Sequence, residues 1–460
     1  MSAVDIRNRI EELLKFTLHS FLNETLQFDL HMSKDFCSHL LKHDPSPDLF
    51  NFSAQSDDSL KGVPPYPLYK RLAFALQHTI MSGTFYRTYN QMPMLGVECS
   101  LSHKEQAWGL LISRKGSDLI DVLKTVDFEL HVREPFFSQL ADGVKRIEGR
   151  CAAGKCSSIG SGNLILFNEC LLFKVQDVRW HASFSDMLEA ESLAEVLPGV
   201  KSIKEGVQIY RKFYSEEEEY SSGVLAICIS RVALQPYFYL ASILSELSYS
   251  GIRGILGLTN TKGTTEHALP PPRSALLSSF TMPYNKNVKG STLTHGARAL
   301  AKHAHRSNNK FWGILDGSGG GEEASKVDIK TRLSQQEPLR VFDSNKNKLA
   351  LDVIVNLVEE CCWLNLHVVP PHGDVFEIRI SHGYGARWSK DGSKLASLSV
   401  VTNGLALHRD NMRMSTQNST LTMKQAVNDG CSRIGGNYCL LAAKCKAITL
   451  VLFKLKYPTL

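Results

Sequence analysis

Lysine, glutamate and arginine recur at close spacing in one short segment, residues 134–150. This segment predicts a helix, a glycine turn and then the pattern Gly143-x-Lys145-x-x-Glu148-x-Arg150. A strand that follows the turn would place Lys145 on one face and Glu148 and Arg150 on the other. Charged groups of both signs would then lie close together where the turn meets the strand. They either bind a charged ligand, or Glu148 and Arg150 form a structural ion pair there.

Two further groups of basic side chains occur in the C-terminal half. In residues 294–306, His, Arg and Lys recur three and four positions apart, which places them on one helix face. The second group lies around residues 383–392 and includes His367, His372, His382 and Glu377. Side chains of these types bind phosphate or transfer protons. A solvated basic helix is the simpler explanation of the first group, whereas a shared cleft would create a phosphate-recognising or phosphate-cleaving site. The anion-binding candidates are His295, Arg298, Lys302, His305, Arg306, Arg379 and Arg387.

The basic clusters of the C-terminal half contain no standard pattern of metal or cofactor ligands. No His-x-x-x-His or paired Cys/His spacing of a known zinc site occurs in that half, and the nearest approach is His303-x-His305. The glycine-rich residues 316–321 lack the lysine and hydroxyl of a phosphate-binding loop, so we predict a flexible loop there. We therefore expect neither a metal nor a cofactor.

The elements around the first motif predict a strand-rich domain. Alternating polar and apolar residues favour strands at 127–132, 163–168, 171–178 and 223–229. Helices are expected at 184–195 and 202–213, and the four glutamates of 216–219 are expected in a solvated loop. Several strands with few helices predict a small barrel.

The whole chain is predicted to be an α+β protein with five regions. Helical spacing makes residues 1–122 mostly helical, and the strand-rich domain spans 123–250. Residues 251–294 are rich in Gly, Ser, Thr, Pro and Asn and are predicted to form a flexible basic linker. A C-terminal α+β domain of unknown function spans 295–394, with a helix at 348–361. Residues 395–460 show little periodicity and are expected to form an irregular tail.

The first motif and the segments after it resemble the ASCH family, named for activating signal cointegrator 1 homology. In that family G-x-K-x-x-E-x-R follows the first helix and lies at the mouth of a cleft. The matching residues here are Gly143, Lys145, Glu148 and Arg150. The resemblance continues through 179–191, 196–215 and 223–227. It implies an ASCH domain with a small PUA-like barrel whose cleft binds RNA or a nucleobase.

The resemblance also implies roles for individual residues. Lys145 and Arg150 would meet phosphate or base oxygens, and Glu148 would orient Arg150 or accept a hydrogen bond from a base amino group. Small bacterial ASCH proteins hydrolyse N4-acetylcytidine with the motif lysine and a threonine three residues later. Glu148 stands at the threonine position here, so Lys145 is a catalytic candidate without the family's hydroxyl. The alternative function is a hydrolase or amidohydrolase acting on a modified nucleoside or a phosphate ester.

The resemblance further implies partners and a place in the cell. Single-stranded RNA or a modified nucleoside is the expected ligand, and protein partners in RNA processing or transcriptional coactivation are expected beside it. Such roles place the protein in the nucleus, the cytoplasm or both. The C-terminal half resembles only a domain of plant ASCH proteins that has no assigned activity.

Composition and charge restrict these functions. The 460 residues include 52 Lys and Arg against 46 Asp and Glu, a net charge of +6. Residues 251–315 hold nine Lys or Arg against one Glu, whereas 126–231 hold twelve against sixteen acids. An acidic barrel favours a pocket for one nucleotide over a groove for a duplex. The 11 cysteines form no C-x-x-C pair, which favours a reducing compartment, so secretion is not expected. No apolar run approaches the roughly 20 residues of a membrane span, so membrane insertion is not expected either.

Overall fold

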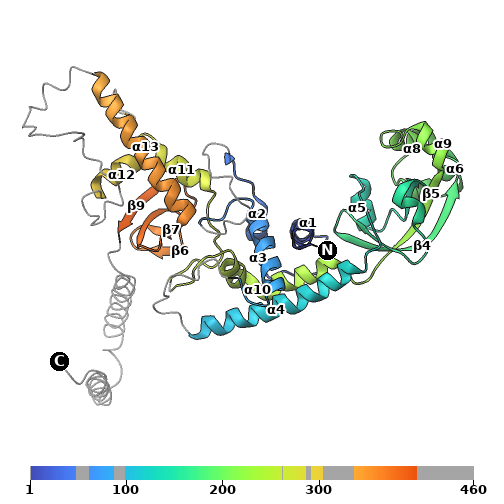
Figure 1. Cartoon of the computed structure of the whole chain (residues 1–460), viewed down its shortest axis with the longest axis horizontal. Coiled ribbons are helices and arrows are strands. Elements are labelled where there is room, and N and C mark those ends of the chain that lie inside the picture. Colours follow the sequence, from blue (N-terminus) through green and yellow to red (C-terminus); the bar gives the residue numbers. More distant parts are fainter. Residues whose placement is uncertain are drawn as a thin grey trace, which may run out of the picture. The chain divides into compact units, whose positions relative to one another are not determined.

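The computed structural model describes residues 2–47, 62–86, 99–261, 263–285, 292–303 and 336–400 (Figure 1). Residues up to Val400 form one compact unit. Its elements make a helical part, a five-stranded sheet and a four-stranded sheet with its own helices. The predicted α+β class is therefore confirmed.

The helical part combines N-terminal helices with one helix from the middle of the chain. Its members are α1 (Ala3–Leu22), α2 (Lys34–Leu41), α3 (Leu68–Ser82), α4 (Cys99–Lys124) and α10 (Pro236–Ile255). Helix α1 begins with a capping box between Ser2 and Asp5 and buries Ile6, Ile10 and Leu13 along one stripe. Helix α10 packs against α1, α3 and α4, so the chain returns to this part after the barrel.

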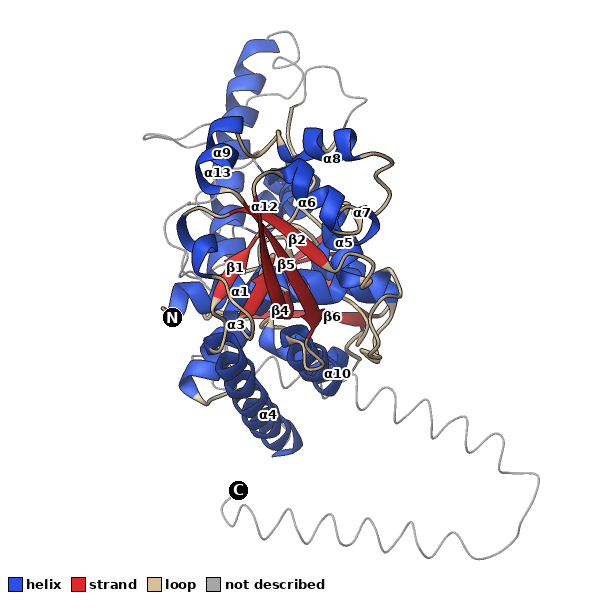
Figure 2. Cartoon of the chain, turned by 90° about the vertical axis from the view of Figure 1, so that its right-hand side faces the viewer, coloured by secondary structure: helices blue, strands red, loops and turns tan. Residues whose placement is uncertain are grey.

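The five-stranded sheet forms the predicted barrel-like domain. Its strands are β1 (Phe128–Leu130), β2 (Ile147–Cys151), β3 (Leu164–Phe167), β4 (Leu171–His181) and β5 (Val224–Arg231). The strand order is β1-β3-β4-β5-β2, with β1 and β3 parallel and the other pairs antiparallel. A bulge between Val175 and Asp177 increases the twist of β4, and the sheet curls into a half-barrel (Figure 2).

Short helices cover this sheet and close a second apolar core. They are α5 (Phe136–Ala141), the 3-10 helix η2 (Gly154–Ser158), α6 (Phe184–Ala190), α7 (Leu193–Val196), α8 (Ile203–Tyr210) and α9 (Glu216–Ser222). Helix α6 packs on α8, β4 and β5, and Phe184 and Met187 are fully buried between them. The helix predicted at 184–195 is broken at Glu191, whose backbone is extended and whose carboxylate accepts a hydrogen bond from Arg179 at 2.7 Å.

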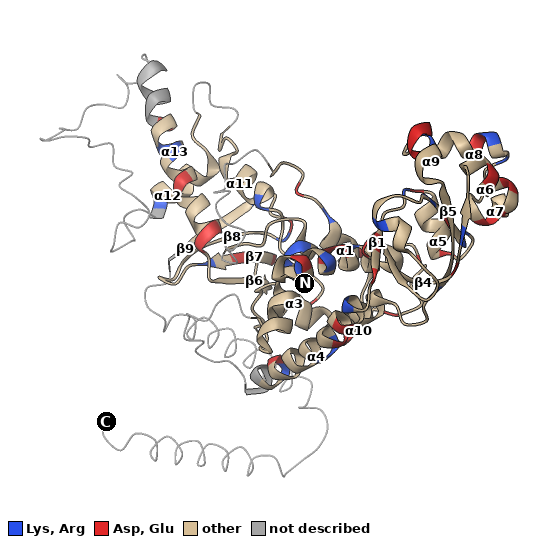
Figure 3. Ribbon diagram, turned by 45° about the vertical axis from the view of Figure 1, so that its right-hand side comes forward, with Lys and Arg blue, Asp and Glu red and all other residues tan. Residues whose placement is uncertain are grey.

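The prediction of a solvated loop at residues 216–219 is wrong. These glutamates begin helix α9, because Ser215 and Glu218 form a capping box and acidic side chains stabilise a helix N-terminus (Figure 3). Glu219 is buried, forms an ion pair with Arg211 and accepts a hydrogen bond from the Phe184 amide at 2.5 Å. One of the four charges therefore holds α9 to α6.

The C-terminal sheet is antiparallel and has one apolar face. Its strands, in the order β6-β7-β8-β9, are β6 (Trp363–Val369), β7 (Gly373–Arg379), β8 (Tyr384–Ser389) and β9 (Leu395–Val400). The neighbouring helices are α11 (Arg273–Thr281), α12 (His295–His303) and α13 (Gln336–Glu360), the last of which contains most of the predicted helix 348–361. Phe376, Ile378 and Trp388 are fully buried, and the Trp388 indole donates to the Leu276 carbonyl of α11 at 3.2 Å.

The prediction that residues 251–294 form a flexible basic linker differs from the structure. Leu258, Leu269 and Phe280 of this segment are buried, and the Thr259 and Thr265 amides donate hydrogen bonds to carbonyls of β6. A few apolar residues are enough to order this segment, because its backbone also pairs with the edge of an existing sheet. Residue 262 and residues 286–291 lie outside the described part of the chain.

The predicted tail at 395–460 begins too early, because residues 395–400 form β9 and pair with β8. Residues 401–460 and the glycine-rich loop at 316–321 lie outside the described residues, and the other domain boundaries remain predictions. None of the helices within the described ranges is both long and apolar enough to cross a membrane.

Candidate functional site

A glycine turn places the charged motif at the start of β2. Helix α5 ends at Ala141 with Asp142 as its C-cap, and Gly143 follows with φ of +72°, a conformation that glycine adopts without strain. The Val144 and Lys145 amides then both donate to the Gln139 carbonyl at 3.0 Å. Gly143 therefore shapes the turn, and the space beside its Cα is open to solvent.

Lys145 lies before β2, is only 2% exposed and uses all of its hydrogen-bond donors. Its ammonium group donates to the carbonyls of Ile147, at 2.7 Å, and Val196, and lies 3.1 Å from Glu148 Oε2. The prediction that Lys145 and Glu148 lie on opposite strand faces is therefore wrong. An ammonium group has three hydrogens, so Lys145 holds Glu148 in place and has no donor left for a ligand.

Glu148 stands between two cations. Arg150 Nε donates to Glu148 Oε1 at 2.8 Å, and Arg150 Nη2 donates to the His131 carbonyl at 2.6 Å. Burial by itself raises the pKa of Glu148, but Lys145 and Arg150 outweigh that effect and hold the pKa below its usual value. The carboxylate is ionised and retains free lone pairs.

These charges lie in the wall of a cleft of about 800 Å³. Four aromatic rings, from α5, α8 and the turn after α8, also line the cleft. The residues that line the cleft are His131, Val132, Arg133, Glu134, Pro135, Phe136, Gln139, Lys145, Glu148, Gly149, Arg150, Leu197, Pro198, Gly199, Val200, Ile209, Tyr210, Lys212, Phe213 and Tyr214. A charged wall beside aromatic rings suits a planar ligand with polar edges.

One buried polar atom in this cleft, Gln139 Oε1, has no hydrogen-bond partner within the described residues, although the Gln139 amide nitrogen donates to the Pro198 carbonyl at 3.0 Å. The Tyr210 hydroxyl is also buried and lies against the backbone of Gly149 in β2, where a methyl group would overlap it. An unpaired polar atom is costly when it is buried, so a polar ligand would compensate Gln139 Oε1.

The mouth of the cleft combines an aromatic ring with positive charge. The Arg133 guanidinium lies 4.8 Å from the centre of the Phe213 ring, which is 45% exposed, and Lys212 precedes Phe213. Sequence reasoning did not select Tyr210, Phe213 or Arg133 as site residues. The signal available was the run of two basic and two aromatic residues, Arg211-Lys-Phe-Tyr214, directly after a helix.

The structure separates the anion-binding candidates of the C-terminal half. His295, Arg298 and Lys302 belong to α12, where the Arg298 guanidinium lies 3.7 Å from the centre of the Tyr284 ring. His305 and Arg306 lie outside the described residues. Arg379 and Arg387 belong to the C-terminal sheet, and no bond joins them to α12 in the part of the chain that the structure describes.

The second histidine-rich group is only partly brought together. His367, Arg379 and Arg387 each contact Glu377. His372 lies in the β6–β7 turn, and His382 makes its contact with Ser381 in the next turn. Within the described ranges no group of three or more His, Cys, Asp or Glu residues could hold a metal ion.

The middle of the chain matches a known family. The model of the ASCH domain matches residues 130–233. Two solved structures are similar, the crystal structure of the hypothetical protein PH0355, at 43% identity and a TM-score of 0.23, and the solution structure of PF0455 from Pyrococcus furiosus, at 42% and 0.22. Each alignment covers 23% of this chain and 98% of the other. No curated protein matches the chain.

These matches define the class of the protein. Residues 130–233 form an ASCH domain, a PUA-like fold that is generally linked to RNA binding. The ASCH domain comprises β1 to β5 with α5 to α9, so the cleft described above lies within it.

Proposed function

We propose that the ASCH domain binds one nucleobase of a single-stranded RNA, or a modified nucleoside, in the cleft beside Glu148 and Arg150. The observation that carries this proposal is the unpaired Gln139 Oε1, which lies with the Tyr210 hydroxyl in the wall that also holds the charged motif. One hydroxyl donor, one amide acceptor and one carboxylate acceptor suit the edge of a base, which has both donors and acceptors.

The remaining contacts have separate roles in this proposal. Phe213 provides a ring on which a base stacks at the mouth, and Arg133 and Lys212 meet the flanking phosphates. Glu148 accepts from a base amino group, and Arg150 both orients Glu148 and adds positive charge. Lys145 is a positioning residue, because its three hydrogens are bonded within the protein.

The same geometry makes RNA binding a better proposal than hydrolysis. A lysine that serves as a base or nucleophile must release a proton and reach the substrate, whereas the Lys145 ammonium is bonded to Ile147, Val196 and Glu148. Glu148 is ionised and flanked by cations, so it is a poor general acid. The hydrolase alternative therefore has less support than a binding pocket.

We place this binding activity in RNA processing or transcriptional coactivation, in the nucleus, the cytoplasm or both. The support for this finer role is the resemblance of the domain to ASCH proteins. The acidic charge of the barrel, visible on α9 in Figure 3, favours recognition of a single exposed nucleotide over contact with many phosphates.

Replacing the Tyr210 hydroxyl tests the proposal with little effect on folding. Tyr210→Phe keeps the buried ring and removes a hydroxyl that contacts the Gly149 backbone, so the free energy of unfolding should change by less than about 1.5 kcal/mol. Loss of one hydrogen bond to the ligand should weaken RNA binding about three- to tenfold. Fluorescence titration of the full chain with a short single-stranded RNA measures the affinity.

Tyr220→Phe is the matched control for this titration, because Tyr220 belongs to α9, is 94% exposed and does not line the cleft. Its affinity for RNA should equal that of the original protein. Equal affinity of Tyr210→Phe and Tyr220→Phe would contradict the role of the cleft.

A further inference from the structure

The C-terminal sheet has one polar face opposite its apolar face. Side chains alternate along β6, β7 and β8, and cross-strand pairing sets Trp363 opposite Arg379 and Glu377 between Asn365 and Arg387. His367 follows Asn365 on the same face of β6. This face therefore gathers one acid, two arginines and a histidine on three neighbouring strands.

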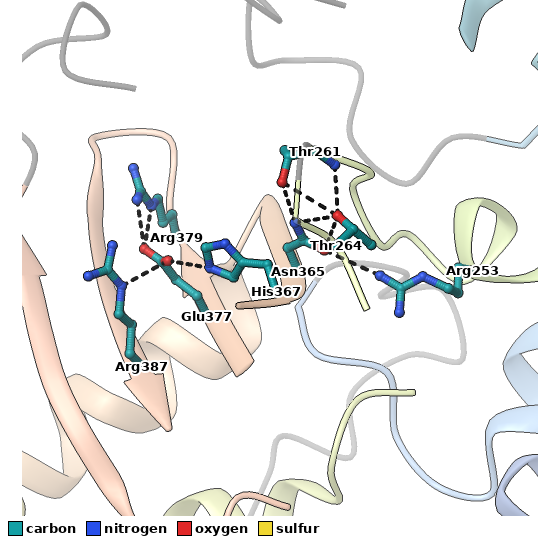
Figure 4. Close-up of polar contacts among 8 residues, drawn as sticks. All are labelled: Arg253, Thr261, Thr264, Asn365, His367, Glu377, Arg379 and Arg387. Carbon is teal, nitrogen blue, oxygen red and sulfur yellow. Dashed lines mark hydrogen bonds and ion pairs between the residues drawn. The ribbon is translucent and has the colours of Figure 1, made fainter. Parts of the chain in front are cut away.

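Glu377 is at the centre of this group and is fully buried. Figure 4 shows the three side chains that converge on its carboxylate. His367 Nε2 lies 2.9 Å and Arg387 Nε 2.9 Å from Oε2, and Arg379 contacts Oε1 through Nε at 2.8 Å and Nη2 at 2.7 Å. The Arg379 guanidinium also lies 5.1 Å from the centre of the Trp363 ring, which fixes its orientation.

The charges in this group do not balance. One carboxylate meets two guanidinium groups, which leaves an excess positive charge even when His367 is neutral. Arg379 Nη1 is buried and has no hydrogen-bond partner among the described residues, and no bond from the terminal nitrogens of Arg387 is found there. Lys145 of the ASCH domain differs, because each of its hydrogens is used. A buried cation with unused donors destabilises the protein unless an anion compensates it.

We propose that Arg379 and Arg387 bind a phosphate group on this polar face, separate from the ASCH cleft. The planar guanidinium groups present several donors to the oxygens of one tetrahedral anion, a geometry that suits phosphate. Access is from the side of Arg387 and His367, whose side chains are 25% and 17% exposed. Glu377 and Trp363 are positioning residues, because they hold the two guanidinium groups and do not themselves meet the anion.

Arg387→Gln tests the site without removing the buried Glu377–Arg379 pair, which remains charge-balanced. Thermal unfolding of the full chain in sodium phosphate, compared with sodium chloride at the same ionic strength, gives the apparent affinity for inorganic phosphate. We expect the variant to bind phosphate at least tenfold more weakly than the original protein. Lys390→Gln is the control with the same charge change. Lys390 is exposed after β8 and pairs with Asp374 at 3.3 Å, so its loss should change the affinity less than twofold.

Two results would overturn the site. One is an equal phosphate affinity in Arg387→Gln and the original protein, and the other is an equal loss in Arg387→Gln and Lys390→Gln. Arg387→Lys provides a second variant that keeps the charge and loses the planar fork, and it should also bind phosphate more weakly. If it retained full affinity, a specific guanidinium site would be excluded.

The phosphate can come from a free nucleotide or from the backbone of an RNA, and competition separates the two sources. An RNA source predicts that a short single-stranded RNA displaces inorganic phosphate and that Arg387→Gln weakens this displacement. A free-nucleotide source predicts displacement by a nucleoside monophosphate and none by an RNA with blocked ends. Tyr220→Phe serves as the reference, because Tyr220 is exposed on α9 and belongs to neither site, so this change should leave the displacement unaffected.

Discussion

Replacement of Lys145 by methionine should lower the free energy of unfolding by about 3 to 5 kcal/mol. Methionine keeps the apolar length of the side chain, so the loss comes from the ammonium group. Without that group, Glu148 loses one of its two cations, and the buried carbonyls of Ile147 and Val196 lose their donor. Urea unfolding of the full chain, followed by circular dichroism, measures the change.

Lys174→Met is the control for this measurement. Lys174 is an exposed residue of β4, so its replacement should change the free energy of unfolding by less than about 0.5 kcal/mol. A similar small effect for Lys145→Met would show that the Lys145 ammonium is solvated or dispensable, and the closed geometry of the motif would then be wrong.

The second large effect concerns Glu377 and acid pH. Burial alone would raise the pKa of Glu377, but the hydrogen bond from His367 and the charges of Arg379 and Arg387 bring it to about 2 from an ordinary value of 4.5. A carboxyl group with a lowered pKa in the folded state stabilises the protein above pH 4.5. That stability, roughly 3 kcal/mol, is lost as the pH falls from about 5 to about 2.

Glu377→Gln should remove this contribution at neutral pH. The variant leaves two guanidinium groups without a carboxylate, so we expect a loss of about 3 to 5 kcal/mol at pH 7 and a weaker dependence on pH below 5. Glu360→Gln, an exposed change at the end of α13, should leave both quantities unaltered. A Glu377→Gln variant as stable as Glu360→Gln at neutral pH would contradict the central role of Glu377.

Local pattern was enough to predict the elements that carry the motif. The strands of the ASCH domain, the glycine turn with positive φ at Gly143 and the helix before it follow from alternation and turn chemistry within a few residues. The burial of Lys145 could not be predicted in this way, because its acceptor at Val196 is 51 residues away in the sequence. The same holds for the contact between Tyr210 of α8 and Gly149 of β2, because β3, β4, α6 and α7 lie between these two elements in the sequence.

Predictions from composition were wrong for two segments whose stabilising contacts are distant in the sequence. The polar segment after α10 has too few apolar residues to fold alone, yet it is held by β6 and by Arg253. That arginine donates to the carbonyls of Thr265 and Ala268. It also donates to Asn365 Oδ1 (Figure 4). The acidic run at 216–219 was likewise expected in solvent, although Arg211 pairs with Glu219. In both segments an arginine provides contacts that a hydrophobic pattern does not reveal.

The central claim is that a nucleobase of RNA enters the cleft between the charged motif and the ring of Phe213. Titration of the full chain with a short single-stranded RNA, comparing Phe213→Ala with Tyr220→Ala, tests it most directly. Both changes remove an exposed ring from the same domain, but only Phe213 lines the cleft. Loss of one stacked base costs about 1 to 3 kcal/mol, so Phe213→Ala should bind RNA at least fivefold more weakly while Tyr220→Ala binds normally. Equal affinities for the two variants would contradict the account.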